Sequence, residues 1–203
     1  MAIPHEEAVR IEAALRTAQA RSTGQIVCVL ARASSSYEVM PLIWSALVAL
    51  ATPWPLLFLT EWSAERIFLI QLAVFLVALC ILSLPALRLR LTPRSVRRAN
   101  AHRAALEQFV LRGVTHCAER NGILIYVSLA EHYARIVADD GIASKVQQSV
   151  WQDAVDALLD RAGNGEVAEG FVIAVEKCGR VLAEHFPREN DDKDELPDRI
   201  YLI

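Results

Sequence analysis

The sequence predicts an α/β protein, an α/β/α sandwich with a small mixed sheet that is interrupted by a two-helix transmembrane hairpin. Three observations lead to this fold class. Two long apolar runs lie close together, two continuous apolar segments rich in β-branched residues predict buried strands, and segments with apolar residues at helical spacing flank those strands. The chain has 203 residues, 54% of them hydrophobic, and a formal net charge of −3.

Two runs without charged side chains predict membrane-spanning helices at residues 39–60 and 67–87. Each run is about 30 Å long as a helix, which matches the hydrocarbon thickness of a bilayer. The connection at residues 61–66 is short, so the two helices must be antiparallel. The alternative is a buried hairpin of a soluble core, but soluble helices average about 11–12 residues. Pro53 and Pro55 predict a kink in the first span, and Pro85 predicts a disturbance at the end of the second.

The distribution of charge predicts the orientation of this hairpin. Residues 88–120 contain eight arginines and two acids, whereas the connection between the spans has Arg66 as its single base. Cytoplasmic flanks carry an excess of Lys and Arg, so both flanks are expected in the cytoplasm. We therefore predict a multi-pass protein of the cell (inner) membrane with both termini cytoplasmic. The first apolar run begins too late for a signal peptide, so no cleaved leader is expected.

The segments outside the hairpin predict one split cytoplasmic domain, made of residues 1–38 and 88–203. Neither piece alone has enough elements for a complete core. Its expected helices are residues 4–20, 95–120, 146–161 and 164–185, and its expected strands are 25–33, 123–130 and 133–138. Residues 189–203 are expected to form an acidic tail without regular structure.

Two adjacent carboxylates, Asp139 and Asp140, follow the third predicted strand and precede Gly141. Open α/β sheets bind ligands at strand ends, and oxygen-rich sites suit Ca²⁺ or Mg²⁺. These residues are therefore candidate metal ligands, and through the metal they are candidates for a phosphatase-like hydrolase. The alternative is a solvated acidic turn that leads into the next helix.

Five arginines follow the second span: Arg88, Arg90, Arg94, Arg97 and Arg98. Juxtamembrane bases interact with anionic lipid headgroups, so these residues are candidate headgroup contacts. The alternative is a purely topological role that requires no specific lipid. No aromatic residues interleave the arginines and the net charge is negative, so no nucleic-acid partner is expected.

The four cysteines form no metal-binding or redox pattern, because no CxxC motif is present. We expect Cys28, Cys80, Cys117 and Cys178 to be scattered small apolar residues in a reducing compartment. The phosphatase loop Cys-x5-Arg and the motifs DxDxT, GxSxG and HExxH are also absent. Any catalytic site therefore lacks a recognisable signature, and catalytic residues cannot be assigned.

Three segments, in order, resemble the TPM domain family. Ser22-Thr23-Gly24-Gln25-Ile26-Val27 is similar to the family's T-G-x-[EQ]-I-x-V strand start. Asn121-Gly122-Ile123-Leu124-Ile125 looks like its N-G-x-L-hydrophobic strand. Arg135-Ile136, followed by Asp139-Asp140-Gly141-Ile142, looks like its R-I…G-x-G-[LI] segment. The resemblance extends over nearly all of the chain outside the hairpin.

The resemblance implies an α/β/α sandwich and a choice of roles. Some plant members are acid phosphatases, and other members assist or assemble membrane complexes. This sequence departs from the family pattern, since a hairpin interrupts the connection between the first two strands and Asp139-Asp140-Gly141 replaces a glycine-rich turn. Bacterial membrane proteins with the domain include such split versions. No catalytic set of the family maps onto this sequence residue by residue.

The leading functional hypothesis from the sequence is a membrane-anchored, non-catalytic accessory or assembly factor for a membrane complex. Its expected partners are the bilayer and a membrane protein. The first alternative is a metal-dependent phosphatase-like hydrolase that uses Asp139 and Asp140, with Ca²⁺ or Mg²⁺ as the possible cofactor. The second alternative is a module that binds anionic lipids through its arginines.

Overall fold

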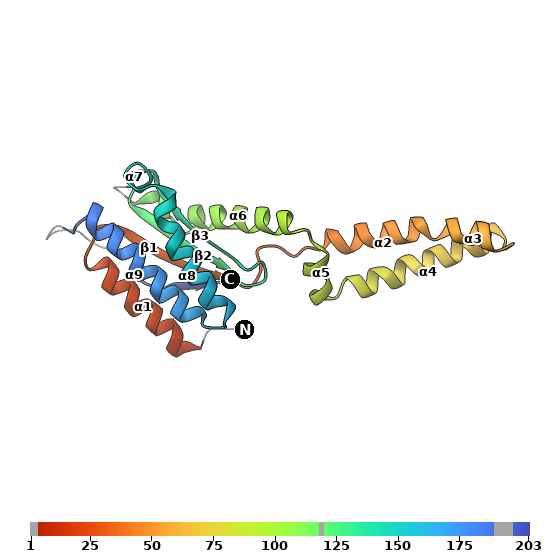
Figure 1. The fold of residues 1–203 in the computed structure, drawn as a ribbon, viewed down its shortest axis with the longest axis horizontal. Coiled ribbons are helices and arrows are strands. Elements are labelled where there is room, and N and C mark those ends of the chain that lie inside the picture. The colour runs from red at the N-terminus through yellow and green to blue at the C-terminus, as the bar shows by residue number, and fades with distance from the viewer. Residues whose placement is uncertain (1–3, 118–119, 189–196) are drawn as a thin grey trace. The chain divides into compact units, whose positions relative to one another are not determined.

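The computed structural model describes residues 4–117, 120–188 and 197–203 and divides the chain into two compact units (Figure 1). The first unit consists of Met1–Ser34 and Arg98–Ile203, and the second consists of Ser35–Arg97. The second unit is thus one continuous stretch of the sequence, and it interrupts the sequence of the first unit.

The first unit contains a four-stranded mixed sheet with the strand order β3-β2-β1-β4. Strand β1 (Gln25–Ala31) pairs in parallel with β2 (Gly122–Ser128) and with β4 (Ile200–Leu202), and β3 (Tyr133–Ala138) is antiparallel to β2. Every residue of β1 and β2 is buried, as their continuous apolar sequences predict. The predicted α/β fold class with a small mixed sheet is confirmed.

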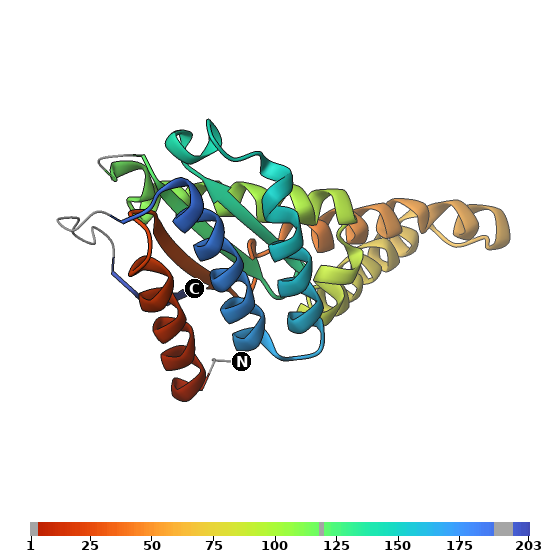
Figure 2. The same cartoon turned by 60° about the vertical axis from the view of Figure 1, so that its left-hand side comes forward.

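Helices cover both faces of this sheet (Figure 2). On one face, α1 (His5–Gln19), α8 (Gln152–Gly163) and α9 (Val167–His185) pack on Ile26, Cys28 and the other side chains of β1 and β2 that point to this side. On the other face, Ala105 and Phe109 of α6 (Arg94–Leu111) pack on Val27, Val29 and Tyr126. The alternation of side chains along β1 and β2 therefore supplies two cores, one for each helical layer.

Several predicted boundaries were wrong. The helix expected to reach residue 120 ends at Leu111, because Gly113 adopts a left-handed conformation (φ 72°) and the 3-10 turn η1 (Val114–His116) follows. The helix expected at residues 146–161 begins later, at Gln152, as α8. The short helix α7 (Asp140–Ala143) and the 3-10 turn η2 (Gln148–Trp151) precede it. Strand β4 was missed. Residues 189–196 of the predicted tail lie outside the described residues, but Ile200–Leu202 pair with Cys28–Leu30.

The second unit is a hairpin of two helices that are long and apolar enough to cross a membrane, Val39–Leu59 and Ala64–Leu82. The first is divided at Thr52 into α2 (Val39–Ala51) and α3 (Pro53–Leu59), where a proline interrupts the backbone hydrogen bonding. The second helix, α4 (Ala64–Leu82), begins earlier and ends earlier than predicted, because a new helix, α5 (Pro85–Leu91), begins at Pro85.

Helices α2 and α4 pack side by side (Figures 1 and 2). The small side chains of Ser45 and Ala49 are buried on α2, so they serve packing within the hairpin. Only 11% and 6% of the residues in the two apolar windows are buried, whereas core helices of a soluble protein are mostly buried. The outer surface of the hairpin is therefore apolar and exposed.

Candidate functional site

Asp139 and Asp140 directly follow β3, as predicted, at the end of the sheet where the parallel strands begin. Strand β3 runs antiparallel to β2, so it ends where the parallel strands β1 and β2 begin. The backbone N–H of Asp139 donates to the carbonyl of Gly122, the first residue of β2, at 2.9 Å. Ligands of open α/β sheets bind at the carboxyl ends of parallel strands. Asp139 therefore lies at the end of the sheet opposite to the carboxyl ends of β1 and β2, and ligand binding there stays a prediction.

Both carboxylates bind the guanidinium of Arg120. Its Nε donates to both carboxylate oxygens of Asp139 at 3.0 Å, and its NH2 group donates to Asp140 at 2.8 Å. Asp139 is 3% exposed and also accepts a hydrogen bond from the Asp140 backbone N–H, so it is the N-cap of α7. The hydrogen bond to Asp139 and its charge raise the pKa of Arg120. The buried carboxylate is thus paired within the chain.

The same end of the sheet contains the residues at which β1 and β2 begin. The Asn121 side-chain amide donates to the Thr23 carbonyl at 2.8 Å, and the Gln25 backbone N–H donates to the Asn121 carbonyl at 3.1 Å. The Gly141 N–H donates to the Arg120 carbonyl at 3.1 Å. We call the set Thr23, Arg120, Asn121, Gly122 and Asp139 the amino-edge joint. It connects three chain segments that are far apart in sequence.

The described residues contain no group of three or more His, Cys, Asp or Glu side chains placed to hold a metal ion. In this structure the Arg120 guanidinium supplies the positive charge beside Asp139 and Asp140. Binding of Ca²⁺ or Mg²⁺ by these two residues stays a prediction. A metal ion at this position would compete with Arg120 for the same carboxylate oxygens.

A second polar cluster, which was not predicted from the sequence, lies at the carboxyl ends of β1 and β2. The Glu131 carboxylate, 7% exposed, accepts hydrogen bonds from the Ser34 backbone N–H at 3.0 Å and from the Ser128 hydroxyl. The Ser34 hydroxyl and the Tyr126 phenol form a hydrogen bond of 2.9 Å. We call these four residues the carboxyl-edge cluster. It fixes Ser34, which is the last residue of the N-terminal segment of the first unit and directly precedes the second unit in sequence.

Tyr126 is kept neutral in this cluster. Burial raises the pKa of its phenol, the hydrogen bond with Ser34 opposes the rise, and the charge of Glu131 adds to it. A neutral phenol is a hydrogen-bond donor as well as an acceptor. The available signals in the sequence were a polar residue, Ser128, at the last position of a buried strand and an acid, Glu131, three residues later.

The five candidate headgroup arginines have different surroundings. Arg88 donates from Nε to the Ser83 carbonyl at 2.7 Å and so caps the end of α4. Arg90, Arg94 and Arg98 are exposed, whereas Arg97 is half-buried. Contact with lipid headgroups stays a prediction for all five.

Three cysteines are buried, as expected for small core residues: Cys28, Cys117 and Cys178. Burial raises the pKa of Cys28 far above its usual range and that of Cys178 to about 12. The thiolate is the nucleophilic form of cysteine, so these two thiols are poor nucleophiles at neutral pH. Cys80 is exposed on α4.

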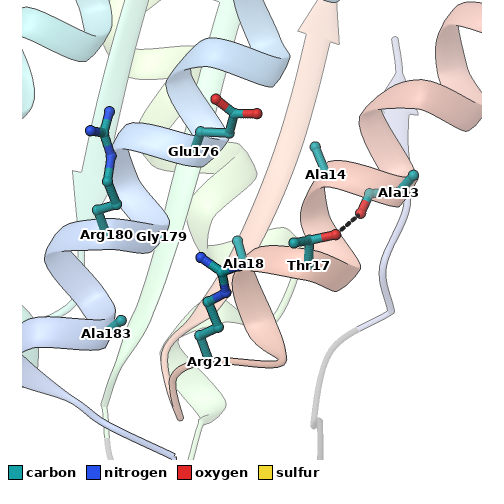
Figure 3. Close-up of a pocket in the computed structure, with 9 residues that line it drawn as sticks. All are labelled: Ala13, Ala14, Thr17, Ala18, Arg21, Glu176, Gly179, Arg180 and Ala183. Carbon is teal, nitrogen blue, oxygen red and sulfur yellow. Dashed lines mark hydrogen bonds between the residues drawn. The ribbon is translucent and has the colours of Figure 1, made fainter.

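A hollow of about 720 Å³ lies between α1 and α9 (Figure 3). Its wall consists mostly of small side chains, including Ala14, Ala18 and Gly179, because the two helices approach closely there. Arg21, Arg180 and Glu176 are the charged residues along it, as the sticks in Figure 3 show. The one hydroxyl among the residues that line it, that of Thr17, donates to the Ala13 carbonyl.

Comparison with known proteins identifies the domain. Residues 91–181 match the family model of the TPM domain. The chain contains a TPM domain. The match includes the Asn121-Gly122 and Arg135-Ile136 segments and continues through most of α9. It begins after Ser22–Val27 in sequence, so the matched region is shorter than the predicted resemblance.

One solved structure supports the same fold. The NMR structure of the BA42 protein from the psychrophilic bacterium Bizionia argentinensis aligns with 98% of this chain and 93% of its own, with a TM-score of 0.61 and 21% sequence identity. At this identity the likeness concerns the fold alone. No curated protein matches the chain.

Proposed function

We propose that this protein is a membrane-anchored accessory or assembly factor, in which a split TPM domain without catalytic activity serves a membrane protein complex. The observation that supports this most directly is the exposed apolar surface of the hairpin. Side chains such as Phe58 (80% exposed) and Leu69 (64% exposed) require lipid or another membrane protein as their environment. Residues 1–38 and 88–203 form the domain of this proposal.

The chemistry of the amino-edge joint favours this role over the hydrolase alternative. Asp139 is needed as an N-cap and as the partner of Arg120, and Asp140 binds the same guanidinium. Carboxylates that act as general base or metal ligand need free oxygen lone pairs directed at the substrate or ion. Here the oxygens of Asp139 accept from Arg120 and from the Asp140 backbone N–H, whereas the exposed Asp140 binds Arg120 through one oxygen.

A photo-crosslinking amino acid at Phe58 or Leu69 tests the accessory role in intact cells. After an alkaline wash that leaves integral proteins in the membrane, we expect both positions to give discrete crosslinked products with one membrane protein. The matched control is Ser45, which is buried within the hairpin and should give no such product. Crosslinks to lipid alone from both exposed positions would contradict the accessory role.

The orientation in the membrane belongs to the same proposal. We propose that both termini and the TPM domain lie in the cytoplasm, since the arginine-rich segment follows the hairpin. Cysteines introduced at Ser63 and Ser149, both exposed, report the two sides. An impermeant thiol reagent should label position 63 from outside intact cells and position 149 only after lysis. The reverse pattern would show the opposite orientation.

A further inference from the structure

A hollow of about 330 Å³ lies beside β3, one of the two edge strands of the sheet, and is lined by residues of α6, β3, η2 and α8 and by His132, which precedes β3. We call it the β3 hollow. Its polar lining comes from Arg98, His132, Arg135, Gln148 and Gln152. Its apolar lining includes Trp151, Val155 and Leu159. None of the residues that line it is acidic.

This absence of acids distinguishes the β3 hollow from other basic hollows of the domain. In the hollow beside α8 and α9 that is lined by Arg10 and Arg161, each guanidinium is paired with an acid, Glu169 and Glu166 respectively. Within residues 4–117, 120–188 and 197–203, Arg98 and Arg135 form no salt bridge. Gln152 does donate to Asp156, so one carboxylate lies next to a lining residue. The charge of the two arginines is otherwise uncompensated at this place.

Two buried N–H groups beside the hollow also have no acceptor in the described part of the chain. They are Nε1 of Trp151, whose side chain is 1% exposed, and Nε of Arg135. An unpaired buried donor costs about 1–3 kcal/mol, so such groups are rare and each requires an explanation. Here both belong to residues that line one hollow, which therefore has a surplus of donors over acceptors.

We propose that the β3 hollow binds a phosphate group carried on an apolar body. Two guanidinium groups match the charge of a phosphate monoester, about −1.5 to −2 at pH 7, better than the single charge of a carboxylate. The planar donors of arginine suit phosphate oxygens, and Val155 and Leu159 are placed to contact the apolar part. The phosphate belongs either to the headgroup of an anionic lipid or to a soluble monoester. This inference does not depend on the accessory role.

Binding to the full chain in a nonionic detergent tests the proposal. The soluble probe is phenyl phosphate, and the lipid probe is dihexanoyl phosphatidic acid, each titrated by isothermal calorimetry. We expect Arg98→Gln to weaken binding of the active probe about tenfold, and the double variant with Arg135→Gln to weaken it further. The matched control is Arg103→Gln, an exposed arginine of the same helix that does not line the hollow. It should bind as the wild type does.

The outcomes separate the alternatives. Binding of phenyl phosphate supports a soluble ligand, and binding of phosphatidic acid alone supports a lipid ligand. The proposal is overturned if neither probe binds, if benzoate binds as tightly as phenyl phosphate, or if Arg103→Gln weakens binding as much as Arg98→Gln. Because Arg98 is an exposed helical residue, its substitution leaves the fold intact even if Arg135→Gln does not.

Discussion

Replacing Gly122 with alanine should lower the free energy of unfolding of the TPM domain by about 2–3 kcal/mol. A Cβ atom at this position would lie 2.4 Å from Cγ1 of Val114 and 2.9 Å from the Val114 carbonyl oxygen. The first contact can relax by moving a side chain, but the second involves the backbone of η1. Hydrogen–deuterium exchange of the β1 and β2 amides would measure the loss, since these amides report on the domain and not on the hairpin.

Two controls separate steric overlap from backbone flexibility. Gly165→Ala meets no atom within 4 Å, and its φ of 86° makes backbone strain of about 1 kcal/mol the expected cost. Adding Val114→Ala to Gly122→Ala should recover part of the stability, because it removes the closer of the two contacts. Equal losses for Gly122→Ala and Gly165→Ala would refute the steric explanation.

Replacing Asp139 with alanine should lower the free energy of unfolding by about 2 kcal/mol. The substitution removes the N-cap of α7 and leaves Arg120 without its buried partner. Asp139→Asn should cost less, because asparagine also caps helices. Asp140→Ala is the matched control: its side chain is 88% exposed, so its effect should stay within about 0.5 kcal/mol. Thermal unfolding of the purified proteins measures all three.

The same experiment tests the metal-dependent hydrolase alternative. An ion that binds only the folded protein raises its apparent stability by mass action. If Asp139 and Asp140 are engaged with Arg120 as described, added Mg²⁺ or Ca²⁺ should leave the unfolding temperature of the wild type unchanged. A rise with the wild type that disappears in Asp139→Asn, together with phosphatase turnover, would establish the metal site instead.

The parts of the fold that the sequence predicted are those whose signal is local. Strands β1 and β2 were recognisable because buried strands of a parallel pair are continuously apolar. The hairpin was recognisable because its two long runs without charged side chains are visible in the sequence itself. Strand β4 has only three residues, and its place is fixed by pairing with Cys28–Leu30, far away in sequence. No local pattern contains that information.

The sites were predicted only in part for the same reason. Asp139 and Asp140 stood out in the sequence as adjacent carboxylates at a strand end, but their partner Arg120 was counted only in the net charge of residues 88–120. The pairing depends on β3 returning antiparallel to β2, which brings residue 139 back to the start of β2. In the carboxyl-edge cluster, Ser34 and Glu131 meet only because β1 and β2 are parallel neighbours.

These contacts also give a physical meaning to the segments that carry the family resemblance. Thr23, Asn121, Gly122 and Asp139 belong to three separate motifs, yet all four lie in the amino-edge joint. Asn121 donates to the Thr23 carbonyl, Gly122 allows close packing on Val114, and Asp139 begins α7. The motifs are thus explained by the way the sheet is closed at one edge, without assigning them a catalytic role.

The place where the chain leaves the domain for the hairpin determines how the domain responds to mechanical force. A force applied at Ser34 in the direction of β1 would act on a strand that pairs in parallel with β2 on one side and with β4 on the other. Such a force shears the β1–β2 and β1–β4 pairings, so many backbone hydrogen bonds must break together. A force perpendicular to the strands would instead break these hydrogen bonds one at a time. The hydrogen bond from the Ser34 N–H to Glu131 adds a further restraint at the point of loading. The connection at Ser34 would therefore resist a force of this direction.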